Sequence, residues 1–421
     1  MLPFVKRRRF LEMLASVGTT GVVGCSSDPP KPKPTPDPPA IELSKSPWLQ
    51  VVGPRAVRLR FETRIESAVP VLFGTDAGSE ELTPTLTTRE ITYVRDFIEG
   101  DPIYFADEAG PHTIHELLLE DLEPGQTYVY SVGEDEAVAG TFRAPPNVGT
   151  ASRVAWLADT SWPLSAEPTA LVSGAAPDLF LHGGDLQYQA NPLDTWNGMS
   201  QALAPVTSRA IAHMCVGNHE FEDGDEIDQM YDRLYGGQGE GNDGTRRYFA
   251  LTYGGVRWIG LDTETGNLAD DAAQLAWLEQ ELAAASSSGD IAQAVVAFHR
   301  PVYTLSKHFP NDTSTRDALH PLFVAHGVGL VMMGHAHCYE RFVVDGINYV
   351  VDGGGGSALY DPNESLEEAD MVRPGESDLR VAVSETRGAT VIDVGADGGL
   401  AIERSDIDGN VTETFAVGVP S

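Results

Sequence analysis

Short apolar runs that alternate with helical patterns constrain the fold of this chain more than any other feature. Runs typical of buried strands occupy residues 154–157, 179–181, 211–216, 256–261, 294–298 and 330–333. Apolar residues at helical spacing predict helices over residues 270–285 and 316–326. Strands that alternate with helices predict an α/β domain built from βαβ units. The chain returns to strands over residues 389–417, with Asp-Gly turns between them.

Side chains that can bind metal ions follow these apolar runs. They are Asp159, Asp185 with Tyr188, Asn218 with His219, His299, and His335 with His337. Singly, each has an ordinary explanation, such as a helix cap, a turn residue or packing at a rim. Because parallel strands end at the same edge of a sheet, we expect these side chains to converge on one crevice. Burial of carboxylates, an amide and imidazoles without a partner of opposite charge would cost too much free energy. Metal ions are the natural partners of such a set.

Residues 41–146 carry a different pattern, of short alternating strands without an amphipathic helix. Residues 56–61 and 127–132 are examples, and the segment EPGQ over residues 123–126 has the composition of a turn. This pattern predicts an all-β sandwich. The segment LEDLEPGQTYVYSV resembles the late strands of a fibronectin type III domain. We expect His112 and His115 to be ordinary loop or strand residues without a catalytic role.

The N-terminal residues have the pattern of an export signal. Residues 7–11, RRRFL, match a twin-arginine signal, and residues 22–25, VVGC, resemble a lipobox that would make Cys25 the lipidated first residue. The apolar segment is too short and too polar for a transmembrane anchor. We expect a signal peptide over residues 1–24 and a Pro-rich tether over residues 25–40. The protein would then be a periplasmic or cell-surface bacterial lipoprotein, bound to the membrane only through Cys25.

The charge of the chain restricts its partners. With 421 residues and a formal net charge of −34, it repels nucleic acid and anionic membranes, so no nucleic-acid partner is expected. A phosphate-bearing substrate would need local positive charge, which metal ions could supply. Besides Cys25, the chain has only Cys215 and Cys338, too few for a disulfide scaffold. We favour two small buried side chains over a disulfide between them.

The ordered motifs resemble those of the purple acid phosphatase branch of the calcineurin-like metallophosphoesterase superfamily. The motifs are Asp159, Gly184-Asp185-x-x-Tyr188, Gly217-Asn218-His219-Glu220, His299 and Gly334-His335-x-His337. Tyr188 is the specific mark of that branch. The resemblance covers nearly the whole mature chain. It implies a metallophosphoesterase domain over residues 147–421, a two-sheet β-sandwich flanked by helices, behind the fibronectin-like sandwich over residues 41–146.

The resemblance also assigns the metal ligands. It gives the first metal Asp159, Asp185, Tyr188 and His337, and the second metal Asp185 as a bridge with Asn218, His299 and His335. A phenolate suits Fe(III), so the resemblance implies Fe(III) in the first site and Fe(II), Zn(II) or Mn(II) in the second. It implies an acid phosphatase that hydrolyses phosphate monoesters by attack of a metal-held hydroxide. His219 and His308 are the candidate catalytic residues, which would contact the phosphate and protonate the leaving group.

Departures from the family pattern leave alternatives open. Phe309 stands where relatives often have a second histidine, which leaves the substrate range open. Ser161 stands where the branch usually has glycine, and a neutral serine is a poor metal ligand. The first alternative is a phosphodiesterase or nucleotidase that uses the same site. The second is a non-catalytic surface protein that binds through its sandwich domain beside a vestigial metal site.

Several segments near the motifs carry simpler predictions. The glycine run over residues 353–356 predicts a loop that lines the site, because no nucleotide-binding register follows it. The acidic segments over residues 220–232 and 364–370 predict solvated loops or helix faces. Arg300 and Arg341 are expected to support the site through ion pairs.

Overall fold

The computed structural model describes residues 43–75, 78–91, 110–133, 138–162, 164–188, 192–220, 231–307 and 313–420. The predicted signal peptide, the tether and the candidate catalytic residue His308 lie outside the described residues. Within the described part, no helix is long and apolar enough to cross a membrane. Residues 41–421 form one compact unit. The boundary near residue 146 stays a prediction.

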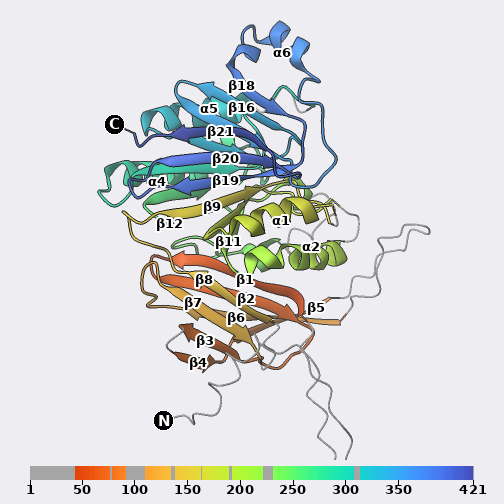
Figure 1. Ribbon diagram of the computed structural model, residues 1–421, viewed down its shortest axis with the longest axis vertical. Coiled ribbons are helices and arrows are strands. Elements are labelled where there is room, and N and C mark those ends of the chain that lie inside the picture. The colour runs from red at the N-terminus through yellow and green to blue at the C-terminus, as the bar shows by residue number, and fades with distance from the viewer. Residues whose placement is uncertain are drawn as a thin grey trace, which may run out of the picture. The chain divides into compact units, whose positions relative to one another are not determined.

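The N-terminal strands form a sandwich, which confirms the predicted strand-rich region (Figure 1). One layer has the order β1-β2-β6-β5, from β1 (Leu43–Gly53), β2 (Ala56–Thr63), β5 (Thr85–Ile91) and β6 (Gly110–Leu119). The other has the order β4-β3-β7-β8, from β3 (Val71–Thr75), β4 (Gly78–Leu82), β7 (Thr127–Val132) and β8 (Ala139–Arg143). These orders are those of an immunoglobulin-type sandwich.

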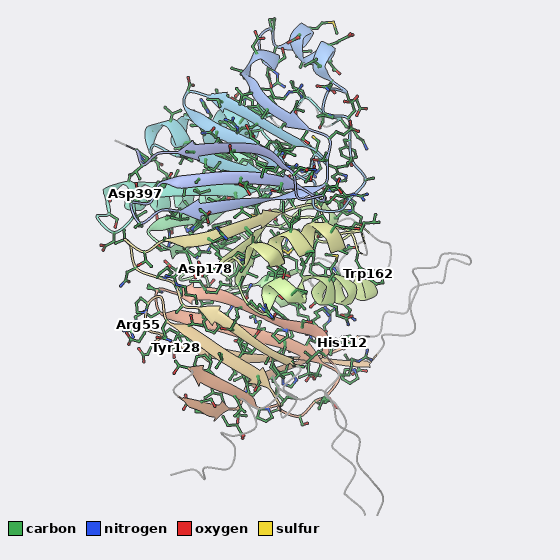
Figure 2. The ribbon with its side chains drawn as sticks, viewed as in Figure 1. Arg55, His112, Tyr128, Trp162, Asp178 and Asp397 are labelled. Carbon is green, nitrogen blue, oxygen red and sulfur yellow. The ribbon has the colours of Figure 1, made fainter. Side chains whose placement is uncertain are left out.

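Tyr128, labelled in Figure 2, fixes the turn before β7. Its hydroxyl accepts the backbone N–H of Glu123 at 2.9 Å. This bond from a tyrosine near the start of a strand to the backbone a few residues upstream is the tyrosine corner of such sandwiches. The Tyr128 ring also stacks with Phe73 and Phe142 in the core. The fibronectin-like resemblance of this segment therefore has a structural counterpart.

The rest of the chain forms two larger sheets with helices on their outer faces, as the fold class predicted. The first sheet continues from β1 through β11 (Ile211–Met214), β10 (Leu179–His182), β9 (Ser152–Leu157), β19 (Gly388–Val394), β20 (Leu400–Asp406) and β21 (Val411–Val417). The second contains β12 (Phe249–Tyr253), β13 (Val256–Gly260), β14 (Gln293–Phe298), β15 (Leu330–Met333), β16 (Tyr339–Val344), β17 (Ile347–Asp352) and β18 (Arg380–Ser384). The helices are α1 (Ala166–Ala175), α2 (Pro192–Thr207), α4 (Ala272–Ser287), α5 (Thr313–Ala325) and α6 (Leu366–Val372).

Strands buried on both faces explain the continuous apolar runs in the sequence. In β14, Val295 points into the core between the two sheets, whereas Val296 belongs to the outer core under α4 and α5. Trp156 and Trp258 fill the inner core from the two sheets. On the other side, Trp196 of α2 belongs to the core that covers β9, β10 and β11. Because both faces of these strands are buried, polar side chains lie where the strands end.

The sandwich and the α/β part share one sheet, which the sequence did not indicate. Strand β1 pairs in parallel with β11 at Leu49 and Ile211. His213 of β11 strengthens this junction, because its Nε2 accepts the backbone N–H of Val51 at 3.0 Å. The ten-stranded sheet therefore runs from the N-terminal strands to the C-terminal ones.

Candidate metal centre

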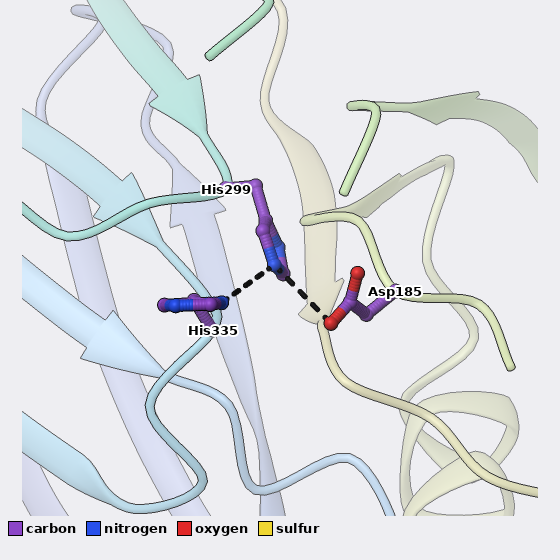
Figure 3. A group of neighbouring side chains, drawn as sticks. All are labelled: Asp185, His299 and His335. Carbon is purple, nitrogen blue, oxygen red and sulfur yellow. Dashed lines mark hydrogen bonds and ion pairs between the residues drawn. The ribbon is translucent and has the colours of Figure 1, made fainter. Parts of the chain in front are cut away.

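The candidate metal centre lies where parallel strands of both sheets end. Strands β9, β10 and β11 run parallel in the first sheet, and β13, β14 and β15 do so in the second. Asp159 and Asp185 follow β9 and β10, while His299 and His335 follow β14 and β15. Figure 3 shows Asp185, His299 and His335 with their side chains turned toward one another. One ligand atom from each of these three lies within 4.8 Å of the other two.

The backbone is strained at these turns. Asp159, Asp185 and His335 have φ angles of 59°, 53° and 69°, in the left-handed region that side chains other than glycine rarely adopt. Two backbone hydrogen bonds hold the first two turns together: Asp159 N–H donates to Gly184 at 3.1 Å, and Thr160 N–H donates to Asp185 at 3.0 Å. Such strain, of order 1 kcal/mol per residue, is concentrated at functional sites. Here it turns side chains toward the crevice.

Tyr188 gathers the first group of predicted ligands. Its hydroxyl oxygen lies 2.7 Å from Asp159 Oδ1, 3.0 Å from Asp185 Oδ2 and 2.9 Å from His337 Nε2. A phenol has one hydrogen, so it can donate to only one of these atoms. Burial, followed by the charges of Asp159 and Asp185, raises the pKa of Tyr188 well above its usual value. A cation among these oxygens and the imidazole would favour the phenolate and satisfy all of them.

His299 gathers the second group. Its Nε2 lies 3.1 Å from Asn218 Oδ1, 3.1 Å from His335 Nδ1 and 3.3 Å from Asp185 Oδ2. Burial alone would lower the pKa of His299, but the Asp185 carboxylate raises it to about 10. Burial would likewise raise the pKa of Asp185, and His299 holds it below its usual range instead. The Asp185 carboxylate is therefore stabilised by a positive charge on His299. A metal ion at His299 Nε2 would supply that charge in place of the proton.

The same oxygen of Asp185 reaches both groups. Oδ2 lies 3.0 Å from the Tyr188 oxygen and 3.3 Å from His299 Nε2. A carboxylate in this position can bridge two cations, which is the arrangement of two-metal sites. The donor set of carboxylates, phenol, amide and imidazoles therefore fits two ions that share Asp185.

Backbone groups orient the imidazoles. Nδ1 of His299 lies 2.9 Å from the Gly183 carbonyl, and Nδ1 of His337 lies 2.7 Å from the Ala358 carbonyl. With Nδ1–H donating to a carbonyl, each ring presents its Nε2 lone pair to the site. Asp159 is also fixed, since its Oδ2 accepts the backbone N–H of His335 at 2.7 Å.

Glu220 holds the turns of the candidate site together, which the sequence did not reveal. Its carboxylate accepts the backbone N–H groups of Asp185, Leu186 and Gly217 at 3.0, 2.9 and 2.6 Å. The side chain is completely buried, so the expectation of a solvated segment starting at residue 220 is wrong for Glu220. Burial, and then the charge of Asp185, raises its pKa to about 8. Its place beside Asn218 was the available signal, but no spacing rule distinguishes a buried acid from an exposed one.

Glycines allow the backbone to approach the ligands. A Cβ on Gly217 would lie 2.2 Å from Asp185 Oδ1, and one on Gly353 would lie 2.7 Å from Asp159 Oδ2. Both distances are too short for a real contact. The loop that starts at Gly353 therefore lines the site, as its glycine run predicted.

Of the remaining predicted residues, His219 and Arg300 lie at the site, whereas the expectation that Arg341 supports the site through an ion pair is wrong. His219 lies at the site, where its ring centre is 4.2 Å from that of Tyr188 and its backbone N–H donates to Asp185 at 2.8 Å. Arg300 pairs with Glu264 at 2.9 Å and lies 3.4 Å from His335, whereas Arg341 pairs with Glu413 away from these contacts.

Two further predictions concern cysteines and surface acids. Cys215 and Cys338 are both buried and both free, which agrees with the interpretation as small buried side chains. In the segment over residues 364–370, Glu367 and Glu368 are exposed on α6, as expected for a solvated helix face. Residues 221–230 of the other acidic segment lie outside the described residues.

Comparisons with known proteins agree with this geometry. Residues 152–339 match the family model described as calcineurin-like phosphoesterase. The chain is 26% identical over 247 residues to purple acid phosphatase 22 of Arabidopsis thaliana, and the alignment covers 57% of this chain and 55% of that protein. It is also 26% identical over 197 residues to a probable inactive purple acid phosphatase 9 of the same plant, covering 39% of this chain and 30% of that protein.

A solved structure shares the fold. The purple acid phosphatase isolated from yellow lupin (Lupinus luteus) seeds superposes with a TM-score of 0.71 at 19% identity, covering 89% of this chain and 74% of that one. The chain spans about half, or less, of the length of the two curated relatives above. Residues 152–339 therefore resemble a calcineurin-like phosphoesterase domain, and the chain is similar to purple acid phosphatases in sequence and in fold.

Proposed function

We propose that this site binds two metal ions and hydrolyses phosphate esters, with monoesters as its main substrates. The observation that carries the proposal is the position of Asp185 Oδ2, 3.0 Å from the Tyr188 oxygen and 3.3 Å from His299 Nε2. One carboxylate oxygen thus joins a hard, oxygen-rich group of ligands to a group rich in imidazole. This asymmetry supports different ions in the two sites.

The contacts around Tyr188 and around His299 give two sets of proposed ligands, one for each ion. Asp159, Tyr188 and His337 would hold the first ion, which we propose is Fe(III), because a phenolate and carboxylates are hard anionic ligands. Asn218, His299 and His335 would hold the second ion, Fe(II), Zn(II) or Mn(II), and Asp185 would bridge the two. Bound there, the ions supply positive charge for the phosphate oxygens and lower the pKa of water.

The chain itself contributes orientation and a proton donor. His219 is held beside Tyr188 by its backbone N–H, while 26% of its side chain stays exposed and Nε2 lies 3.9 Å from Asp185 Oδ2. From this position the imidazole can donate a hydrogen bond to a phosphate oxygen or a proton to the departing alcohol. His308 remains a second candidate on sequence grounds, eight residues beyond Arg300 of the site.

The acidic surface is consistent with an exported protein, and we propose export through the twin-arginine pattern with acylation at Cys25. Metabolic labelling with a radioactive fatty acid tests this step. Label is expected on the wild-type chain and absent from Cys25→Ser. Equal labelling of both would contradict acylation at that residue.

Turnover of p-nitrophenyl phosphate by the metal-loaded full chain tests the main proposal. Asp185→Asn removes the bridging charge and is expected to lower kcat/KM by at least about 100-fold. Asp393→Asn is the matched control, because this carboxylate is 53% exposed and pairs with Arg153 at the surface. It is expected to change the rate by less than about twofold.

The alternatives give different results in the same assay. Faster turnover of bis(p-nitrophenyl) phosphate than of the monoester would indicate a phosphodiesterase. Metal binding without turnover of either ester would overturn the enzymatic proposal, and would place the protein with a non-catalytic group such as the probable inactive relative.

A further inference from the structure

Lys307 and Tyr360 form a cation–aromatic pair beside the candidate metal centre. The Lys307 Nζ lies 4.6 Å from the centre of the Tyr360 ring. That ring stacks on the imidazole of His337, with ring centres 4.1 Å apart and planes 16° apart. Because His337 covers one face of the phenol ring, the ammonium lies over the other. A positive charge is therefore held one aromatic ring away from a proposed metal ligand.

Two loops that are distant in sequence are anchored so that this pair can form. The backbone N–H of Tyr360 donates to the carbonyl of His337 at 3.0 Å. The residues before Lys307 are buried, and the N–H of Leu305 donates to Glu340 Oε1 at 3.0 Å. Glu340 is itself completely buried. Lys307 therefore follows a buried segment that is held by hydrogen bonds, and its ammonium contacts the Tyr360 ring.

The ammonium is available to a ligand. Lys307 is exposed, and within the described part of the chain no carboxylate forms an ion pair with it. A cation–π contact leaves N–H groups of the ammonium free to donate. The chain has a net charge of −34, so an anionic substrate meets a repulsive surface and gains from one cation at the edge of the site.

We propose that Lys307, positioned by Tyr360, is a specificity-determining residue that binds a second anionic group on the leaving group of a phosphate ester. The group would be a carboxylate or a second phosphate that reaches past Tyr360, whose ring centre lies 4.1 Å from that of His337 and 4.6 Å from Lys307 Nζ. This inference rests on the proposed function, because it needs the ester phosphate to occupy the metal centre. Substrates with two separated anionic groups are then preferred over neutral alkyl or aryl esters.

Matched substrates test this preference. The metal-loaded full chain is assayed with 4-carboxyphenyl phosphate and with 4-carbamoylphenyl phosphate, which has nearly the same shape without the charge. Lys307→Gln is expected to lower kcat/KM about three- to fivefold for the carboxylate ester, the upper part of the range for an exposed ion pair. Its kcat/KM for the carbamoyl ester is expected to stay within about twofold of the wild-type value. Lys307→Arg is expected to restore the preference, because it keeps the charge.

The variant Tyr360→Leu tests the positioning of Lys307 separately from its charge. Without the ring, the ammonium is no longer held, so this variant is expected to lose the same discrimination while it retains Lys307. Its metal content is measured in parallel, because the Tyr360 ring also stacks on the proposed ligand His337, and loss of the discrimination at wild-type metal content is the expected result. 1,4-Phenylene bisphosphate in place of the carboxylate ester shows which of the two anionic groups Lys307 prefers.

A binding measurement keeps the inference testable without turnover. Calorimetry gives the Kd of 4-carboxybenzylphosphonate and of its neutral amide, and Lys307→Gln is expected to weaken only the first, by about three- to fivefold. Equal losses for the two ligands, or none, would overturn the role of Lys307 even if phosphatase activity is normal. Absence of turnover with every ester would instead count against the proposed function, while the ratio of the two Kd values would still decide about Lys307.

Discussion

Glu220 Oε2 accepts the backbone N–H of Asp185 at 3.0 Å, and the same oxygen accepts the N–H of Gly217 at 2.6 Å. One buried carboxylate therefore ties the turn after β10 to the turn after β11. Those turns carry Asp185, the proposed bridging ligand, and Asn218, a proposed ligand of the second ion. The hydrogen bonds from Asp185 and Gly217 to Glu220 therefore fix the spacing between the two turns.

Replacing Glu220 should loosen the metal centre without removing a ligand. Glu220→Gln turns one acceptor oxygen into an N–H₂ group that faces backbone donors, so we expect metal affinity to fall about 10- to 100-fold. Affinity is measured by competition with a chelator. Glu279→Gln, at an exposed position on α4, is the control and should bind metal as the wild type does. Unchanged affinity in Glu220→Gln would show that the turns keep their positions without this carboxylate.

Gly217 tests the close approach of the backbone to Asp185. In Gly217→Ala the new Cβ would lie 2.2 Å from Asp185 Oδ1, so the turn must move. We expect a loss of stability of about 1–3 kcal/mol in urea unfolding, together with weaker metal binding. The matched control is Gly289→Ala, where the Cβ meets no atom within 4 Å and the expected change is below about 0.5 kcal/mol. Equal stability of the two variants would contradict the geometry.

A buried ion cluster joins the N-terminal sandwich to the α/β part. Glu62 of β2 accepts from Lys45 at 2.6 Å, from Arg233 at 3.0 Å and from His112 at 3.1 Å. Burial alone would raise the pKa of Glu62, but Lys45 and its other partners hold it well below its usual value. His112, labelled in Figure 2, is thus a core residue of this junction.

Lys45→Met should destabilise the protein strongly, because it leaves Glu62 buried with less positive charge. We expect the free energy of unfolding to fall by about 3 kcal/mol. Glu123→Gln removes the charge of an exposed pair with Arg55, in which the Arg55 and Glu123 side chains are 48% and 74% exposed, and should cost less than about 0.5 kcal/mol. Equal and small effects in chemical denaturation would mean that the cluster does not stabilise the junction.

His115 should make the sandwich sensitive to acid. Burial lowers the pKa of His115 to about 4, from an ordinary value of 6.5. The folded state therefore binds the proton less readily than the unfolded state, so this stabilisation is complete above pH 6.5 and is lost as the pH falls toward 4. Its contribution is at most about 3 kcal/mol.

His115→Phe is the variant for this test, because Phe cannot titrate and can keep the stacking on Phe61, whose ring centre is 4.5 Å away. Unfolding free energies of both proteins are measured at about pH 7 and about pH 4. The wild type is expected to lose more stability on acidification than the variant does. Parallel pH dependences would show that His115 titrates alike in the folded and unfolded states.

The sequence predicted the elements of the fold well and their junction poorly. Continuous apolar runs such as residues 330–333 identified strands, because a strand buried on both faces leaves that signal. The pairing of β1 with β11 left none, because it involves one register position, Leu49 with Ile211. Long-range pairing of this kind depends on which surfaces meet, and a single sequence does not record that.

The sequence predicted which side chains lie together at the candidate site, but it did not predict the groups that support them. Asp159, Asp185 and His335 were recognised by their place after strands and by the family resemblance. Their left-handed backbone could not be, because that conformation follows from hydrogen bonds such as the one between Asp159 and Gly184. Lys307 and Tyr360 are distant in sequence, so their contact appeared only in the structure.

Metal stoichiometry of the purified full chain tests the central claim most directly. We predict two bound ions per chain by elemental analysis, with a broad visible absorption if iron occupies the first site. Tyr188→Phe should abolish that absorption and weaken one ion, because it removes the phenolate oxygen between Asp159 and Asp185. A folded wild-type protein that binds no more than one ion, after exposure to iron, zinc and manganese, would contradict the account.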